Sequence, residues 1–275
     1  MSFVHRAVVM AMGILTLSPG LLAQQLKPET LHEFECYVQG AEKRMDARQV
    51  FLLADSDAAL NGKVVGGHRI ETVEPNGANP HNVPNGLVFD WIGTVFIPGA
   101  TLDRTVRMLQ DYDHRDRYFS ETISASKLLC RKGENQFHYS MRLKEPAVVD
   151  VDSDVVWERV DAHRWRCRSY STEVRAVGKD KGYLRRLFSY WRFVEVKDGV
   201  YVEGETITMS DEFGSFMRAL GSMMGINPEK SLRHSLESMR ESLTKPGMEF
   251  PAPPTGLADC GEPYRPTGCM GESRH

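Results

Sequence analysis

The chain has 275 residues, of which 41% are hydrophobic and 26% are charged, a balance that is ordinary for a globular protein. Its length allows one large domain or two small ones with a sizeable core. The formal net charge is −3 and no long run of Lys or Arg occurs, so we expect no nucleic-acid partner.

Residues 1–23 have the sequence of features that defines a secretory signal peptide. Arg6 precedes an apolar run at residues 7–17, and a Pro-Gly pair and a small residue, Ala23, follow it. The run is short for a membrane span. We therefore expect the segment to be removed and the rest of the chain to be periplasmic or secreted. A buried N-terminal helix is the alternative interpretation.

Residues 24–86 read as an N-terminal extension. Apolar residues at helical spacing predict a helix over residues 28–48, with Pro28 in its first turn. Residues 63–73 are expected to form a strand, and residues 74–86 a loop because they are rich in Asn, Pro and Gly. The helix needs a surface to cover. Its spaced apolar residues are Leu31, Phe34, Val38, Ala41 and Met45.

Residues 87–245 carry the pattern of one folded domain. An apolar strand at residues 87–97 ends at Pro98-Gly99, and Thr101 caps a helix that follows. Six strand-like segments with short connections then predict an antiparallel sheet. A long helix over residues 228–244 completes the domain, with Asn227 as its N-cap. The six segments are residues 121–131, 135–144, 148–160, 164–177, 187–196 and 200–209.

The last two strands form a hairpin whose turn decides which side chains face inward. A two-residue Asp198-Gly199 loop, a strong hairpin signal, predicts that Trp191 pairs with Thr206, Phe193 with Gly204 and Arg192 with Glu205. Trp191 and Phe193 then lie inside, over small partners. Three charged residues then point to solvent, and Glu195 shares the inner face near the turn. The outer face also ends in apolar residues, which the helix at residues 28–48 is a candidate to cover. The outward charged residues are Arg192, Glu203 and Glu205, and the apolar ones are Tyr190, Ile207 and Met209.

Alternation in the other strands predicts the same two-faced sheet. Glu158 is expected beside Arg166 on the outside. The inner surface combines large aromatics with Ser, Thr and Gly, where a close-packed core would hold branched aliphatics. Plain core packing and a space for a ligand both remain open. The inward set is Phe137, Tyr139, Met141, Leu143, Val155, Trp157, Cys167, Ser169 and Ser171.

The order of elements and two short motifs resemble the START-like (SRPBCC, helix-grip) superfamily. The motifs are W-x-G-x-x-F-I-P-G-A at residues 91–100 and S-Y-W-R-F at residues 189–193. The resemblance implies an α+β fold in which a curved antiparallel sheet of six to seven strands grips the C-terminal helix. The N-terminal helix predicted from its spacing is an addition to that fold. The resemblance also implies an apolar cavity between the sheet and the C-terminal helix. The expected cavity-lining residues are Tyr139, Met141, Trp157, Ser169, Trp191, Phe193, Thr206 and Leu236.

Motifs for metal and cofactor chemistry are not recognisable, so we expect neither. The acidic cluster at residues 111–121 lacks the pattern of a calcium loop and is interpreted as a solvated helix end in which Arg115 and Arg117 neutralise the acids. No C-x-x-C pair occurs among the five cysteines, whose connectivity cannot be read from the sequence. Cys260 and Cys269, close together in a Pro- and Gly-rich and therefore flexible tail at residues 246–275, are the expected pair.

Three functions are compatible with this pattern. The first is an exported carrier or binding protein for a hydrophobic small molecule or lipid. The second is an enzyme similar to polyketide cyclases or dehydratases, with Glu173 and Glu195 as candidate acid and base. The third is a protein-interaction module. Residues 212–225, rich in Phe and Met, are a candidate for gating ligand access or for transient membrane contact, the alternative being an apolar connector.

Overall fold

The structure, a computed structural model, describes residues 26–56, 71–73, 81–144, 148–178, 183–211, 228–252, 257–267 and 269. In these residues nine strands form one antiparallel sheet in the order β1-β3-β9-β8-β7-β6-β5-β4, and β2 also pairs with β3. The long strand β3, early in the chain, lies beside β9, the last. The strands are β1 Glu71–Val73, β2 His81–Val83, β3 Gly86–Pro98, β4 Ile123–Gly133, β5 Gln136–Leu143, β6 Val149–Arg159, β7 Arg164–Ala176, β8 Leu184–Val196 and β9 Gly199–Asp211.

The helices begin and end close to the predicted positions. Thr101 caps α3 by accepting a hydrogen bond from the Arg104 backbone N–H at 3.4 Å. The predicted signal peptide, the cap Asn227 and residues 212–225 lie outside the described residues. The helical segments are α1 Pro28–Asp46, η1 Leu53–Ser56, α3 Leu102–Gln110, η2 Tyr112–His114, α4 Arg115–Tyr118 and α6 Pro228–Thr244.

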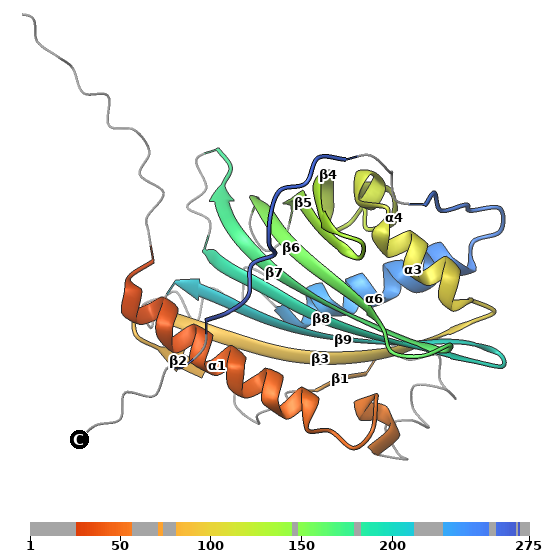
Figure 1. Cartoon of the computed structure of the whole chain (residues 1–275), viewed down its shortest axis with the longest axis horizontal. Helices are drawn as coiled ribbons and strands as arrows, with labels where there is room; N and C mark the ends of the chain where they lie inside the picture. The colour runs from red at the N-terminus through yellow and green to blue at the C-terminus, as the bar shows by residue number, and fades with distance from the viewer. Residues whose placement is uncertain are drawn as a thin grey trace, which may run out of the picture.

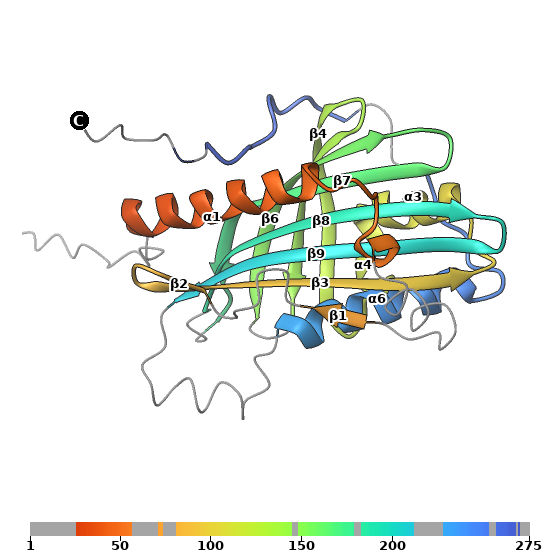
Figure 2. The same ribbon diagram turned by 90° about the horizontal axis from the view of Figure 1, so that it is seen from below.

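The curved sheet separates two layers of helices (Figure 1). On one side α6, α3 and α4 enclose the larger apolar core with the sheet. On the other side α1 covers a second cluster, and Figure 2 shows α1 on the near side of the sheet. Phe34 of α1 packs against Phe188 of β8 with ring centroids 5.1 Å apart. The predicted α+β helix-grip architecture with an added N-terminal helix is therefore confirmed.

The hairpin β8–β9 has the predicted faces but a different register. Its two-residue loop is Lys197-Asp198, so Trp191 pairs with Gly204 and Phe193 with Val202, displaced by two residues from the prediction. A shift of two keeps every side chain on its face, because side chains alternate along a strand. The observed register is favoured over the predicted one because the Trp191 ring occupies the space that a side chain at position 204 would need.

The charged residues of the outer face are buried, which corrects the prediction that they point to solvent. Glu203 and Glu205 are each 1% exposed, because the end of α1 and the residues after it cover them. Arg44 binds Glu205 at 2.7 Å, and Arg48 binds both glutamates at 3.0 Å. These partners make burial of the acids tolerable, since an unpaired buried charge is strongly unfavourable.

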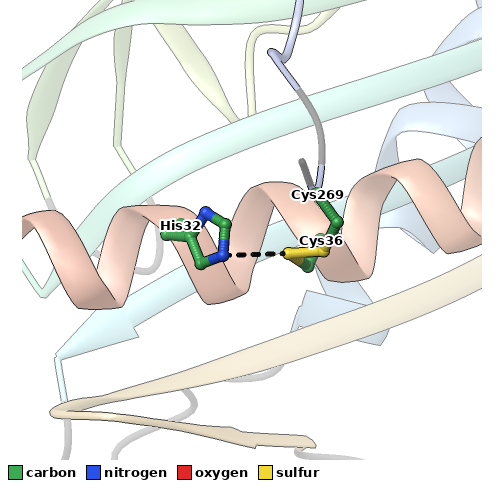
Figure 3. Close-up of side chains that lie close together, drawn as sticks. All are labelled: His32, Cys36 and Cys269. Atoms are coloured by element: carbon green, nitrogen blue, oxygen red, sulfur yellow. Dashed lines mark hydrogen bonds between the residues drawn. A yellow bond between two sulfur atoms is a disulfide. The ribbon is translucent and has the colours of Figure 1, made fainter. Parts of the chain in front are cut away.

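The C-terminal segment is attached to the sheet and to α1, so the expectation of an unpacked tail is wrong for its described residues. Figure 1 shows its dark blue trace running from β4 to α1. Disulfides join Cys130 to Cys260 and Cys36 to Cys269, in place of the expected Cys260–Cys269 pair. Figure 3 shows Cys36 and Cys269 on α1 and the tail. The two tail cysteines anchor the segment at separate points.

Hydrogen bonds reinforce these anchors between the disulfides. The Tyr264 hydroxyl donates to Glu35 on α1 at 2.6 Å, and the Tyr264 backbone N–H donates to Asp154 on β6 at 2.6 Å. Asp154 is 1% exposed and also contacts Lys132 and His138. The tail therefore covers polar groups of the outer face that would otherwise be in solvent. None of the helices described is long and apolar enough to cross a membrane.

Candidate ligand-binding cavity

A cavity of about 160 Å³ lies between the inner face of the sheet and α6. From α6 it is lined by Leu232 and Met239, and by the smaller Ser231 and Ser235. The segment from α3 to the start of β4 closes another side. Its lining residues there are Leu109, Arg115, Phe119, Thr122 and Ile123.

Small side chains on neighbouring strands create the space. Ser169, Ser189 and Thr206 stand opposite one another on β7, β8 and β9, as the strand register places them. Next to this row, Trp191 lies over Gly204 and pairs on its other side with Cys167. A row of short side chains beneath α6 leaves a volume that larger aliphatic residues would fill.

Five of the eight residues expected to line a cavity do line this one. They are Tyr139, Met141, Trp157, Trp191 and Thr206. The other three are buried nearby and do not line it. Ser169 lies within hydrogen-bond distance of the Tyr139 hydroxyl at 3.2 Å, Phe193 stacks on Trp157 at 5.7 Å, and Leu236 is 0% exposed. A ligand contact by any of the eight stays a prediction.

Residues 111–118 contribute to the cavity and to the packing around it, which the sequence did not predict. Tyr112 is 1% exposed, not part of a solvated helix end, and its hydroxyl accepts a hydrogen bond from the Trp157 indole at 2.8 Å. Arg115 follows at helical spacing and lines the cavity instead of neutralising an acid. The i, i+3 spacing of Tyr112 and Arg115 was the available signal, because such residues share a face of a helical turn.

Burial favours the neutral forms of two titratable groups at the cavity, Cys167 and Tyr112. Burial raises the pKa of the Cys167 thiol to about 12, although the nearby Arg115 charge opposes the shift. Burial likewise raises the pKa of Tyr112 well above its usual value. The described lining residues include no Asp, Glu or His. Carboxylates and imidazoles are the side chains that most often act as acid or base near neutral pH, and the described lining contains neither.

Glu173 and Glu195, the sequence-based candidates for acid and base, lie elsewhere. A bulge between Asp152 and Ser153 of β6 changes the pairing along β7, so Glu173 stands opposite Asp152 and is exposed. Its prediction from parity fails for that reason. The Glu195 carboxylate accepts a hydrogen bond from the Leu102 backbone N–H at 3.3 Å, at the start of α3.

A group of atoms that could bind a metal ion lies where the C-terminal segment meets α1. The His32 Nε2, Cys36 Sγ and Cys269 Sγ atoms are within 4.8 Å of one another (Figure 3). Metal binding by cysteine needs the thiolate. Since Cys36 and Cys269 form a disulfide, this group is a structural link in the form described.

No family model matches the sequence, and no curated protein is similar to it. Solved structures are similar in fold. A STAR-related lipid transfer protein from Xanthomonas axonopodis is 18% identical, with 61% of this chain and 98% of that chain covered at a TM-score of 0.44. Zhui aromatase/cyclase from Streptomyces sp. R1128 is 10% identical, with 56% and 92% covered and a TM-score of 0.44. The human StarD13 lipid transfer and protein localization domain is 12% identical, with 76% and 96% covered and a TM-score of 0.42.

Proposed function

We propose that this protein binds a hydrophobic small molecule, or the hydrophobic part of a lipid, in the cavity beneath α6, and acts as its carrier. The observation that carries the proposal is the cavity itself, about 160 Å³ in volume and lined largely by aromatic and aliphatic side chains. Concave, mostly apolar sites with a few polar groups are typical of small-molecule binding. A carrier needs no reactive side chain in such a site.

Unfilled volume in the interior lowers the stability of a folded protein. At about 24 cal/mol per Å³, a cavity of this size costs roughly 4 kcal/mol of stability. An apolar molecule that fits recovers contacts of this kind, because both its surface and the lining leave water. Binding of such a molecule therefore stabilises the folded state of the protein.

The size of the cavity limits the ligand. Sites for drug-sized molecules usually have volumes of roughly 300–1,000 Å³, whereas this cavity has about 160 Å³. We infer a compact molecule, or one chain of a larger lipid, as the occupant.

The cyclase-like alternative has no specific support. It requires an acid or base inside the cavity, and the two candidate glutamates lie outside it. A binding role accounts for the same wall without them, so it is the function we favour.

We also propose that the protein is exported. Two disulfides connect distant parts of the described chain, and such bonds persist mainly in oxidising compartments. This supports the signal-peptide interpretation of residues 1–23. Expression of the full-length chain in a bacterium, followed by N-terminal sequencing of the periplasmic fraction, tests the proposal. Recovery of the uncleaved chain solely in the cytoplasm would contradict it.

A cavity-filling substitution tests the binding proposal. Ser189 lines the cavity with a small side chain, and Ser189→Phe is expected to occupy the space and weaken binding of the neutral probe N-phenyl-1-naphthylamine at least tenfold. Ser124→Phe, at an exposed position on β4, is the matched control and should bind like the wild type. Equal binding by both variants would place the probe elsewhere and contradict the proposal.

A further inference from the structure

Arg115 is the one charged side chain among the described residues that line the cavity. It is the first residue of α4, and its backbone N–H donates to the Ser126 hydroxyl at 3.0 Å, which fixes the turn against β4. The turn directs a long cationic side chain toward an apolar space. Such a placement is unfavourable for a cation unless it has partners.

Arg115 is half-buried, and the protein gives its guanidinium only part of the hydrogen bonding that it can form. Nη2 donates to the Leu109 carbonyl at 2.7 Å, and the guanidinium lies 4.7 Å from the ring centroids of both Tyr112 and Tyr139. Nε is buried and has no hydrogen-bond partner in the part of the chain that the structure describes. No carboxylate among the described residues forms an ion pair with Arg115. The side chain is therefore held in place by ring contacts and one carbonyl, with donor capacity left over.

We infer that the hydrophobic ligand of this cavity carries a carboxylate that binds the Arg115 guanidinium. The inference rests on the proposed function and specifies its ligand as a hydrophobic carboxylic acid. An anion completes the hydrogen bonding of the guanidinium and compensates its charge in a low-dielectric site. The planar fork of Arg matches the two oxygens of a carboxylate.

The remainder of the wall is suited to the hydrocarbon part of such an acid. Leu109 and Trp157 lie near Arg115 in the lining, and Leu232 and Met239 of α6 extend the apolar surface. No acidic side chain in the described lining repels a carboxylate or attracts an amine. The ligand class is therefore set by charge at Arg115 and by apolar contact elsewhere.

The experiment compares two probes that differ in charge. Isothermal titration calorimetry at pH 7.5 measures binding of 1-naphthaleneacetic acid and of the neutral 2-(1-naphthyl)ethanol to the full-length protein as purified. A charge-assisted contact predicts that the wild type binds the acid about tenfold to a hundredfold more tightly than the alcohol. Arg115→Met should abolish this preference, so that the variant binds the acid and the alcohol with affinities that agree within about threefold.

Arg117→Met is the matched control, because it removes one positive charge two residues away at an exposed position. It should keep the preference for the acid. Arg115→Lys retains the charge but not the planar fork, and should keep a reduced preference. If Arg115→Met fails to fold, the wild type alone decides by comparing the acid with its methyl ester, which should bind with the lower affinity of the alcohol.

The outcomes separate this inference from the proposed function. Equal binding of acid and alcohol by the wild type, or a preference retained by folded Arg115→Met, overturns the inference and leaves a hydrophobic binding function standing. Absence of binding by the acid, the ester and the alcohol contradicts both.

Discussion

The ring of Trp191 on β8 lies over Gly204, its direct partner on β9, and occupies the place of a side chain at that position. The contact lets the indole lie close against the sheet as part of the cavity wall. It also explains the register of the hairpin, because a side chain at position 204 of β9 would overlap the Trp191 ring. The glycine therefore connects strand pairing to the shape of the cavity.

Replacing Gly204 is predicted to destabilise the protein and to weaken ligand binding. The β-carbon of Gly204→Ala would overlap the Trp191 ring, and overpacking of this kind usually costs about 1–3 kcal/mol. Urea unfolding measures the loss, and titration with N-phenyl-1-naphthylamine measures the effect of the displaced ring on affinity.

Gly40→Ala provides the control for that substitution. Gly40 is exposed on α1, and no atom lies within 4 Å of the position that its β-carbon would take. Because Ala favours helices more than Gly does, the change should stabilise the protein by about 0.5–1 kcal/mol. Equal effects of the two substitutions would contradict the packing argument at Gly204.

The buried carboxyl group of Asp90 predicts an unusual pH dependence of stability. Asp90 is 1% exposed on β3, and burial, with a further contribution from the Glu205 charge, raises its pKa to about 7 despite the nearby Arg44. The folded protein then binds a proton between about pH 4 and 7 that the unfolded chain does not bind. This contribution to stability is present at low pH and is lost as the pH rises through 7.

The size of the effect follows from the change in pKa. One pKa unit corresponds to about 1.4 kcal/mol, so the shift from the usual value sets an upper bound of roughly 4 kcal/mol. Unfolding of the wild type and of Asp90→Asn is measured at pH 5 and pH 7.5, and the wild type should lose stability relative to the variant as the pH rises. Asp150→Asn is the control, because Arg142 holds the pKa of Asp150 below its usual range and this group does not titrate in the window. If the difference in unfolding free energy between the wild type and Asp90→Asn is the same at both pH values, the raised pKa of Asp90 is contradicted.

The disulfide connectivity predicts a defined peptide map. Digestion without reduction should give linked peptides containing Cys36 with Cys269 and Cys130 with Cys260. The double substitution Cys130→Ser/Cys260→Ser removes a bond that spans 130 residues and should lower the free energy of unfolding by about 2–5 kcal/mol. A peptide linking Cys260 to Cys269 would refute this connectivity.

Side-chain periodicity was sufficient to predict β1, β3 to β9, the long helices and the two faces of the sheet. It did not predict β2, His81–Val83, which lies in a segment expected to be a loop because of its Asn, Pro and Gly content. The inward set that includes Tyr139, Trp157 and Trp191 follows from alternation, which depends only on local spacing. The predicted turn of the last hairpin lies one residue too late, which displaces the pairing by two residues, and the faces are still correct because that displacement is even. Five of the predicted lining residues could be found in this way.

Features that depend on distant partners could not be predicted. Glu203 and Glu205 looked like solvent-facing residues, because Arg48 and Arg44 lie 155 and 161 residues earlier in the chain. The sequence predicts an unpacked tail, because its composition does not reveal where Cys260 and Cys269 attach. The sequence predicts that Arg115 lies on a charged surface, because the direction of its side chain depends on how a short helical turn meets β4.

Methyl-resolved NMR tests the central claim most directly, that the space beneath α6 receives a hydrophobic molecule. Met141 and Met239 line the cavity, whereas Met45 and Met209 belong to the cluster on the other side of the sheet. Titration of the full-length protein with 2-(1-naphthyl)ethanol should shift the methyl resonances of Met141 and Met239 in a saturable way and leave those of Met45 and Met209 nearly unchanged. If Met141 and Met239 do not respond, or if the outer pair responds instead, the account is contradicted.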